Sequence, residues 1–130
     1  MSDTPAEYRA WVDKAKEDLL CIRNELAAAE KPWSVICFHA EQAAEKYLKA
    51  FLVANGVRPE RTHDLGRLLS ECAKFDPSLQ GLAQDCEKLT EFAVDIRYPD
   101  IPLEAEEETG REAVKLAGQI CEAVRARLPN

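Results

Sequence analysis

A stripe of polar side chains runs along segment 33–55, which is otherwise apolar. Glu45 and Lys49 stand at i and i+4 in the order that favours an ion pair on a helix, and Gln42 and Lys46 form a second neighbouring pair. Clustered cations are the groups that bind phosphate. Two interpretations are open: a ligand-binding surface or a solvated helix edge. The stripe consists of His39, Gln42, Lys46 and Lys49, with Glu41 and Glu45 beside it.

A second group with useful chemistry stands at residues 97–100, which read RYPD. The arginine can hold a phosphate and the tyrosine ring can stack on a base. Alternatively, the segment is only a helix stop, in which Arg97 meets the terminal carbonyls or a glutamate of the last helix. Asp100 belongs to the same group and is included among the candidate ligand-binding residues.

Arg58 and His63 are separated by four residues in the polar segment RPERTH. A histidine can act as general base on a ribose 2′-hydroxyl, and an arginine can stabilise the charge that develops on phosphorus. Both residue types are common in loops, so we favour a capping or hydrogen-bonded role for His63. The pair is retained as the candidate catalytic group.

The helix that must position the stripe is predicted over 32–55. Its apolar residues recur at three- and four-residue steps in two adjacent rows, which makes a face wide enough for more than one neighbour. We therefore expect this helix at the centre of a bundle, with Gly56 ending it in a left-handed conformation. One row is Ile36, Ala40, Ala43, Tyr47, Phe51 and Ala54; the other is Cys37, Ala44, Leu48 and Leu52.

Four further helices are predicted around it. The first begins at Pro5, capped by Thr4 or Asp3, and ends near Ala29 or Glu30 after a seven-residue apolar repeat. A short third helix over 65–72 is capped by Thr62 or Asp64. A fourth runs from the Asp76–Pro77 start to Ile96, and a fifth covers 104–128. No segment alternates with period two, so we predict one all-α domain over residues 1–130, an up-and-down antiparallel bundle of four to five helices.

Composition narrows the functional classes. The formal charge of −7 disfavours non-specific nucleic-acid binding but leaves room for a local basic pocket. No glycine-rich phosphate loop and no known hydrolase or metalloprotease motif is present, and we expect no cofactor. No apolar run is long enough for a membrane span and no secretory signal is visible, so we expect a cytoplasmic protein away from the membrane.

The five cysteines are dispersed and form no CxxC pair. Most lie on apolar rows, which predicts reduced, buried side chains in a reducing cytosol. Cys37 and His39 stand two apart on a helix and point to different faces, so we expect no metal site.

Three segments in this order resemble the HEPN domain (higher eukaryotes and prokaryotes nucleotide-binding): FHAEQAAEKYLKAFL, THDLGRLL and RYPD. The resemblance implies a helical bundle that commonly forms a homodimer, often encoded beside a minimal nucleotidyltransferase in a toxin–antitoxin pair. Other members are metal-independent RNases. The family's recurrent polar positions correspond to Gln42, Glu45, Lys46, Lys49, His63, Arg97 and Tyr98.

One departure from the family bears on catalysis. The RNase members share a late arginine followed after four to six residues by histidine, whereas Arg97 is followed by YPDIPLE. We therefore predict a non-catalytic dimeric module that binds nucleotide, RNA or a nucleotidyltransferase. The alternatives are an RNase toxin, with His63 as base and Arg58 or Arg97 as phosphate clamp, and a purely structural helical adaptor.

Overall fold

The computed structural model describes residues 7–129, which form five α-helices and one 3-10 helix and contain no strand. The elements in chain order are α1 (Tyr8–Ala27), α2 (Trp33–Ala54), α3 (Leu65–Ala73), η2 (Pro77–Leu82), α4 (Ala83–Asp95) and α5 (Leu103–Arg125). The expected all-α antiparallel bundle is confirmed. None of the helices in this part of the chain is long and apolar enough to cross a bilayer.

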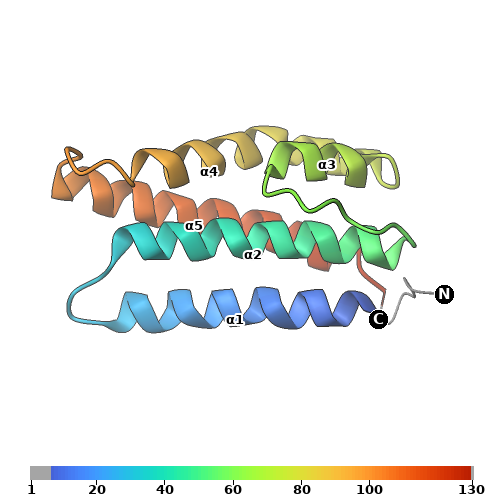
Figure 1. Ribbon diagram of the computed structural model, residues 1–130, viewed down its shortest axis with the longest axis horizontal. Coiled ribbons are helices and arrows are strands. Elements are labelled where there is room, and N and C mark those ends of the chain that lie inside the picture. Colours follow the sequence, from blue (N-terminus) through green and yellow to red (C-terminus); the bar gives the residue numbers. More distant parts are fainter. Residues whose placement is uncertain (1–6, 130) are drawn as a thin grey trace.

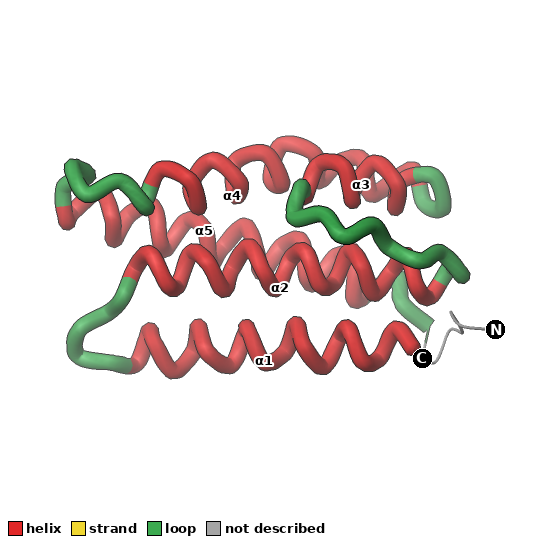
Figure 2. Tube along the Cα trace, in the orientation of Figure 1, coloured by secondary structure: helices red, strands yellow, loops and turns green. Residues whose placement is uncertain are grey.

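The helices run up and down along one long axis (Figure 1). α1 and α2 form an antiparallel hairpin, α5 lies behind α2, and α3 and α4 share the remaining edge. α2 contacts α1, α3, α4 and α5, as expected of a central helix. Figure 2 shows the long connection between α2 and α3 turning back along α2, which places the THD segment beside the middle of that helix.

The core is built around the two apolar rows of α2. Ile36, Ala40 and Leu48 are fully buried, and Tyr47 is 3% exposed. Burying such side chains supplies most of the favourable free energy of folding. Residues of α3, α4 and α5 complete the same cluster, among them Leu65, Leu68, Leu89, Ala113, Ala117 and Ile120.

Helix ends follow the local signals except in α1, α4 and α5. The last helix, α5, ends at Arg125, before the predicted end at Leu128. Gly56 has φ of 79°, and the Asp64 side chain accepts from the Arg67 backbone N–H to cap α3, as predicted. α1 ends at Ala27, two to three residues early, because Ala28 is already extended. The predicted start of α1 at Pro5, capped by Thr4 or Asp3, lies outside the described residues.

The fourth predicted helix is not one continuous α-helix. Residues Pro77–Leu82 form the 3-10 helix η2, and α4 begins only at Ala83. The Asp76 carboxylate accepts from the backbone N–H of Ser78, and Leu79 N–H bonds the Asp76 carbonyl three residues back. These bonds close a tighter turn at the start, and Gly81 gives little support to an α-helix.

Candidate functional site

The polar stripe of α2 is largely buried, so a solvated helix edge is the wrong description. Glu45 is 3% exposed, Lys49 6% and Glu41 9%. Lys49 Nζ donates to Glu45 Oε2 at 3.0 Å, which is the predicted i,i+4 pair. Lys49 also lies 5.4 Å from the centroid of the Trp11 ring. A buried pair of this kind needs further partners to offset the loss of hydration.

His63 supplies one such partner from the loop before α3. Its Nδ1 lies 2.8 Å from Glu45 Oε1, so one carboxylate is shared by Lys49 and His63. The accepting group is a carboxylate, so Nδ1 carries the hydrogen and the neutral ring keeps Nε2 as acceptor. The His63 side chain is 79% exposed. The result is a carboxylate–histidine pair with its outer nitrogen accessible.

Arg97 reaches the same edge of α2 from the end of α4. Burial raises the pKa of Glu41, and the positive charge of Arg97 opposes that rise. Glu45 raises the Glu41 pKa further, whereas His63 lowers it. Glu41, Glu45, His63 and Arg97 therefore form one electrostatic group, assembled from three separate segments.

Lys46 belongs to a different group on the side of α2 that faces α1. Its Nζ donates to Asp18 Oδ2 at 2.7 Å, and the other Asp18 oxygen lies 2.9 Å from His39 Nδ1. His39 Nε2 is 3.5 Å from Glu25 Oε2. The structure thus pairs Lys46 with α1, not with Gln42, which is half-buried beside it.

Asp18 and Glu25 were missed as polar partners. They stand seven residues apart on α1, alongside the apolar repeat, which is the spacing of a flanking position on a helix that packs against a neighbour. This acidic i,i+7 pair, on a helix predicted to pack against the helix that carries His39 and Lys46, was the sequence signal that could have identified them. Glu25 Oε1 is sealed from solvent without a hydrogen-bond partner.

The RYPD segment forms an exposed turn after α4. The backbone N–H groups of Arg97 and Tyr98 donate to Val94 and Asp95 carbonyls, so the backbone ends the helix as expected. Tyr98 is 60% exposed. No hydrogen bond from the Arg97 side chain is formed within residues 7–129. Asp100 is exposed in the same turn.

Arg58 lines a different, small cavity. Together with Pro59, Leu68 and Glu71 it borders a space of about 100 Å³ between the α2–α3 connection and α3. Its role as phosphate clamp for His63 remains a prediction.

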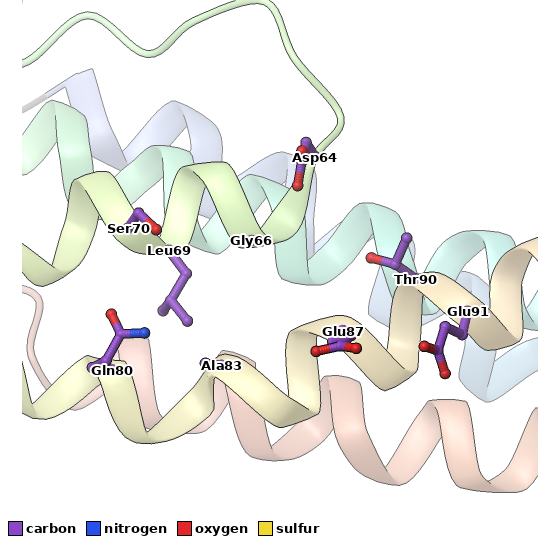
Figure 3. A pocket seen from close by; sticks show the side chains of 9 residues that line it. All are labelled: Asp64, Gly66, Leu69, Ser70, Gln80, Ala83, Glu87, Thr90 and Glu91. Carbon is purple, nitrogen blue, oxygen red and sulfur yellow. The ribbon is translucent and has the colours of Figure 1, made fainter.

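A groove that sequence reasoning did not single out lies between α3 and α4 (Figure 3). It has a volume of about 410 Å³ and carries the carboxylates of Asp64, Glu87 and Glu91. Leu69 points into it from α3, and the Gln80 amide points toward it from η2. The acidic lining disfavours phosphate, so this groove does not fit the predicted ligand.

No cluster of three or more histidine, cysteine or carboxylate side chains suited to a metal ion occurs between residues 7 and 129. The five cysteines are free: Cys21 is half-buried and the others are buried. Burial raises the pKa of Cys37, Cys72 and Cys86 to about 12 in each case. These thiols act as core side chains.

Comparison with known proteins adds one finding. The model of the family described as HEPN domain matches residues 8–127, nearly the whole chain. No match was found among curated proteins or among solved structures.

Proposed function

The chain belongs to the HEPN domain family, and from this premise we propose that it is a dimeric, non-catalytic module that binds a nucleotide or an RNA end. The observation that carries the proposal is the RYPD turn, where an arginine and an aromatic residue that follow each other in the chain are both exposed. Arg97 is the phosphate contact and Tyr98 is the stacking surface for the base.

The two lysines of the predicted site have a different task. Lys46 is already neutralised by Asp18 and Lys49 by Glu45. A phosphate would have to displace a buried carboxylate from either of them, which is costly. We therefore assign Lys46 and Lys49 to holding the scaffold. We assign His63 and Asp100, which are both exposed, to the border of the contact proposed for Arg97 and Tyr98.

The same face supports pairing with a second copy. Val35 and Phe38 are 41% and 48% exposed on α2, one to two turns before Glu41, the carboxylate that responds to Arg97. A two-fold contact through these apolar side chains removes them from water and brings two RYPD turns together. Two Arg97–Tyr98 pairs on one dimer would give a longer contact for RNA than either pair alone.

Titration followed by amide chemical shifts tests the binding part. We expect AMP, ATP and a short RNA oligonucleotide to shift the signals of Arg97 and Tyr98. Arg97→Gln should weaken binding about tenfold, since a charge-assisted contact is lost. Arg23→Gln, an exposed arginine on α1, is the matched control and should change nothing. An absence of shifts at millimolar ligand would leave the helical adaptor as the function.

Light scattering tests the dimer. Phe38→Glu should give a monomer, because it buries a charge in the proposed interface. Phe75→Glu is the control: Phe75 is 46% exposed and lies after α3, away from this face. A wild-type monomer at every concentration would contradict the pairing.

The partner is proposed to be a minimal nucleotidyltransferase of the kind encoded beside many HEPN proteins, as in toxin–antitoxin pairs. Capture of the tagged protein from native lysate, followed by mass spectrometry, tests this. Recovery of a small nucleotidyltransferase with wild type is the expected result. Its absence would contradict the partner without affecting the nucleotide titration.

One observation favours a second candidate, a metal-independent RNase. Glu45 holds His63 Nδ1, so Nε2 can take the proton of a ribose 2′-hydroxyl. The 2′-oxygen would attack phosphorus, the bond to the 5′-oxygen would break, and water would protonate that leaving oxygen. Arg97 would stabilise the charge on phosphorus. Total RNA incubated with chelator should then be cleaved by wild type and not by His63→Ala; no cleavage, or equal cleavage, excludes this candidate.

A further inference from the structure

A second cavity lies where the first turns of α1 meet the last turns of α5, at the opposite end of the bundle from the RYPD turn (Figure 1). Its volume is about 350 Å³, within the roughly 300–1,000 Å³ of small-molecule pockets. Three cationic side chains line it, Arg9, Lys16 and Arg125, together with the carboxylate of Asp13, and Arg125 is also paired with Glu122.

Tyr47 of α2 lines the cavity from the core. Its side chain is only 3% exposed, yet its hydroxyl forms no hydrogen bond within residues 7–129. The hydroxyl oxygen itself is not sealed from solvent: Tyr47 borders the cavity, so the hydroxyl can donate a hydrogen bond there. The hydroxyl of the neighbouring Tyr8, by contrast, donates to the Pro129 carbonyl at 2.5 Å. The Tyr47 hydroxyl is therefore a donor available to a ligand in this cavity.

Arg125 lines the same cavity, and hydrogen bonds to Glu122 fix its orientation. Its Nε donates to Glu122 Oε2 at 2.8 Å and its Nη2 donates to Glu122 Oε1. The third nitrogen, Nη1, makes no hydrogen bond in the described part of the chain. Arg125 and Tyr47 both line this cavity. A guanidinium fixed on one edge loses little freedom when its other edge binds an anion.

Two more cations come from α1. Lys16 is exposed and forms no ion pair within residues 7–129. The Arg9 guanidinium lies 5.1 Å from the centroid of the Tyr8 ring, at the mouth of the cavity. Val12 and Leu128 add apolar wall between these polar groups. The lining thus combines donors for a phosphate with a surface for a partly apolar organic group.

We propose that this cavity binds a small phosphomonoester, whose phosphate accepts hydrogen bonds from the Tyr47 hydroxyl, Arg125 Nη1 and the Lys16 ammonium, while Val12 and Leu128 contact its organic part. The site is separate from the contact proposed for Arg97 and Tyr98 and does not depend on it.

The protonation state of Tyr47 suits this role. Burial raises the pKa of the hydroxyl, Cys121 and Glu122 add to the rise, and Arg125 opposes it. The group therefore keeps its proton at neutral pH and remains a donor.

Chemical-shift titration of the full chain with AMP, inorganic phosphate and adenosine tests the proposal. AMP and phosphate should both shift the amides of Lys16, Tyr47 and Arg125, and adenosine should shift them far less. Tyr47→Phe deletes one unpaired oxygen and should keep the fold while weakening AMP binding about tenfold. Arg125→Gln should weaken it by a similar factor.

Arg111→Gln is the matched control for Arg125→Gln. Arg111 is also an exposed α5 arginine held by a glutamate of its own helix, with Nε 2.9 Å from Glu107 Oε2, but it lies far from the cavity. The control should leave the affinity for AMP unchanged. The proposal is overturned if AMP shifts only the RYPD turn, if adenosine binds as well as AMP, or if Arg111→Gln and Arg125→Gln weaken binding equally.

Discussion

His63 Nδ1 lies 2.8 Å from Glu45 Oε1, and this contact ties the loop before α3 to the middle of α2. Glu45 is 3% exposed and His63 lies on the surface, so the histidine ring acts as a cover over a buried carboxylate. Lys49 neutralises that carboxylate from the same helix. The pairing explains how charged residues can occupy a stripe on the most buried helix of the molecule.

Removing the charge of Glu45 should show how much this charge contributes to the stability of the bundle. Glu45→Gln leaves the buried Lys49 ammonium without a counter-charge, and we expect a loss of about 3 kcal/mol in the free energy of unfolding. Glu107→Gln breaks an exposed i,i+4 pair with Arg111 and should cost only about 0.3 kcal/mol. Urea denaturation of both variants measures the difference; equal losses would mean that Lys49 finds water or another partner.

Glu41 should make the protein less stable as pH rises. Burial raises its folded-state pKa above the ordinary 4.5, so the folded state holds its proton more tightly than the unfolded chain. At pH values between the pKa of Glu41 in the unfolded chain and its higher pKa in the folded protein, the folded state binds more protons. The free energy of unfolding therefore falls as the pH rises through this range. Glu41→Gln should abolish this contribution and stabilise the protein at pH 7 by about 1 kcal/mol.

Urea unfolding of wild type and Glu41→Gln at a series of pH values between 4 and 7 tests this. The two stabilities should converge at the acid end and diverge toward neutrality. A constant difference across the range would show that Glu41 ionises freely in the folded protein.

The sequence was sufficient to predict most of the helices and one of the two local contacts in the polar stripe. The two apolar rows of α2 predict its central place, and the i,i+4 spacing predicts Glu45–Lys49, because both depend only on helical periodicity. Gly56 and Asp64 likewise act within a few residues of their position. Family membership followed from three short segments in the right order.

Contacts between side chains of different helices could not be predicted from helical periodicity. Lys46 meets Asp18 across 28 positions of sequence, and that pairing depends on the register of α1 against α2, which periodicity does not set. Tyr47 was assigned to the core from its place in an apolar row; nothing in the row shows that its hydroxyl opens into a cavity shared with Arg125. The η2 turn was missed because Asp76–Pro77 marks a helix start without distinguishing a 3-10 from an α turn.

The cysteines should differ sharply in reactivity. Cys21 is half-buried, whereas the other four are buried, and burial raises the pKa of Cys121 to about 12. The thiolate is the reactive form, so a thiol reagent should modify Cys21 alone in the native protein and all five cysteines in urea. Absorbance of the released product counts the reactive thiols. Cys21→Ser should remove the native reaction; a second fast thiol in that variant would contradict the assignment.

The packing of α5 against the start of α2 gives a test of the fold itself. A Cβ placed on Gly110 would lie 2.4 Å from Trp33 Cε3, whereas one on Gly118 of the same helix meets nothing within 4 Å. Gly110→Ala should therefore lower the free energy of unfolding by about 2 kcal/mol through overpacking. Gly118→Ala should raise it by about 0.5 kcal/mol, because alanine is the better helix former.

A second substitution can separate the overpacking expected for Gly110→Ala from its effect on helix propensity. Trp33→Leu removes the ring that the new methyl group would meet, so Gly110→Ala should cost much less in that background than in wild type. Urea unfolding of the four proteins gives the coupling directly. If Gly110→Ala stabilises the wild-type chain as Gly118→Ala does, the close contact between α5 and Trp33 is not present in solution, and the placement of α5 behind α2 would need revision.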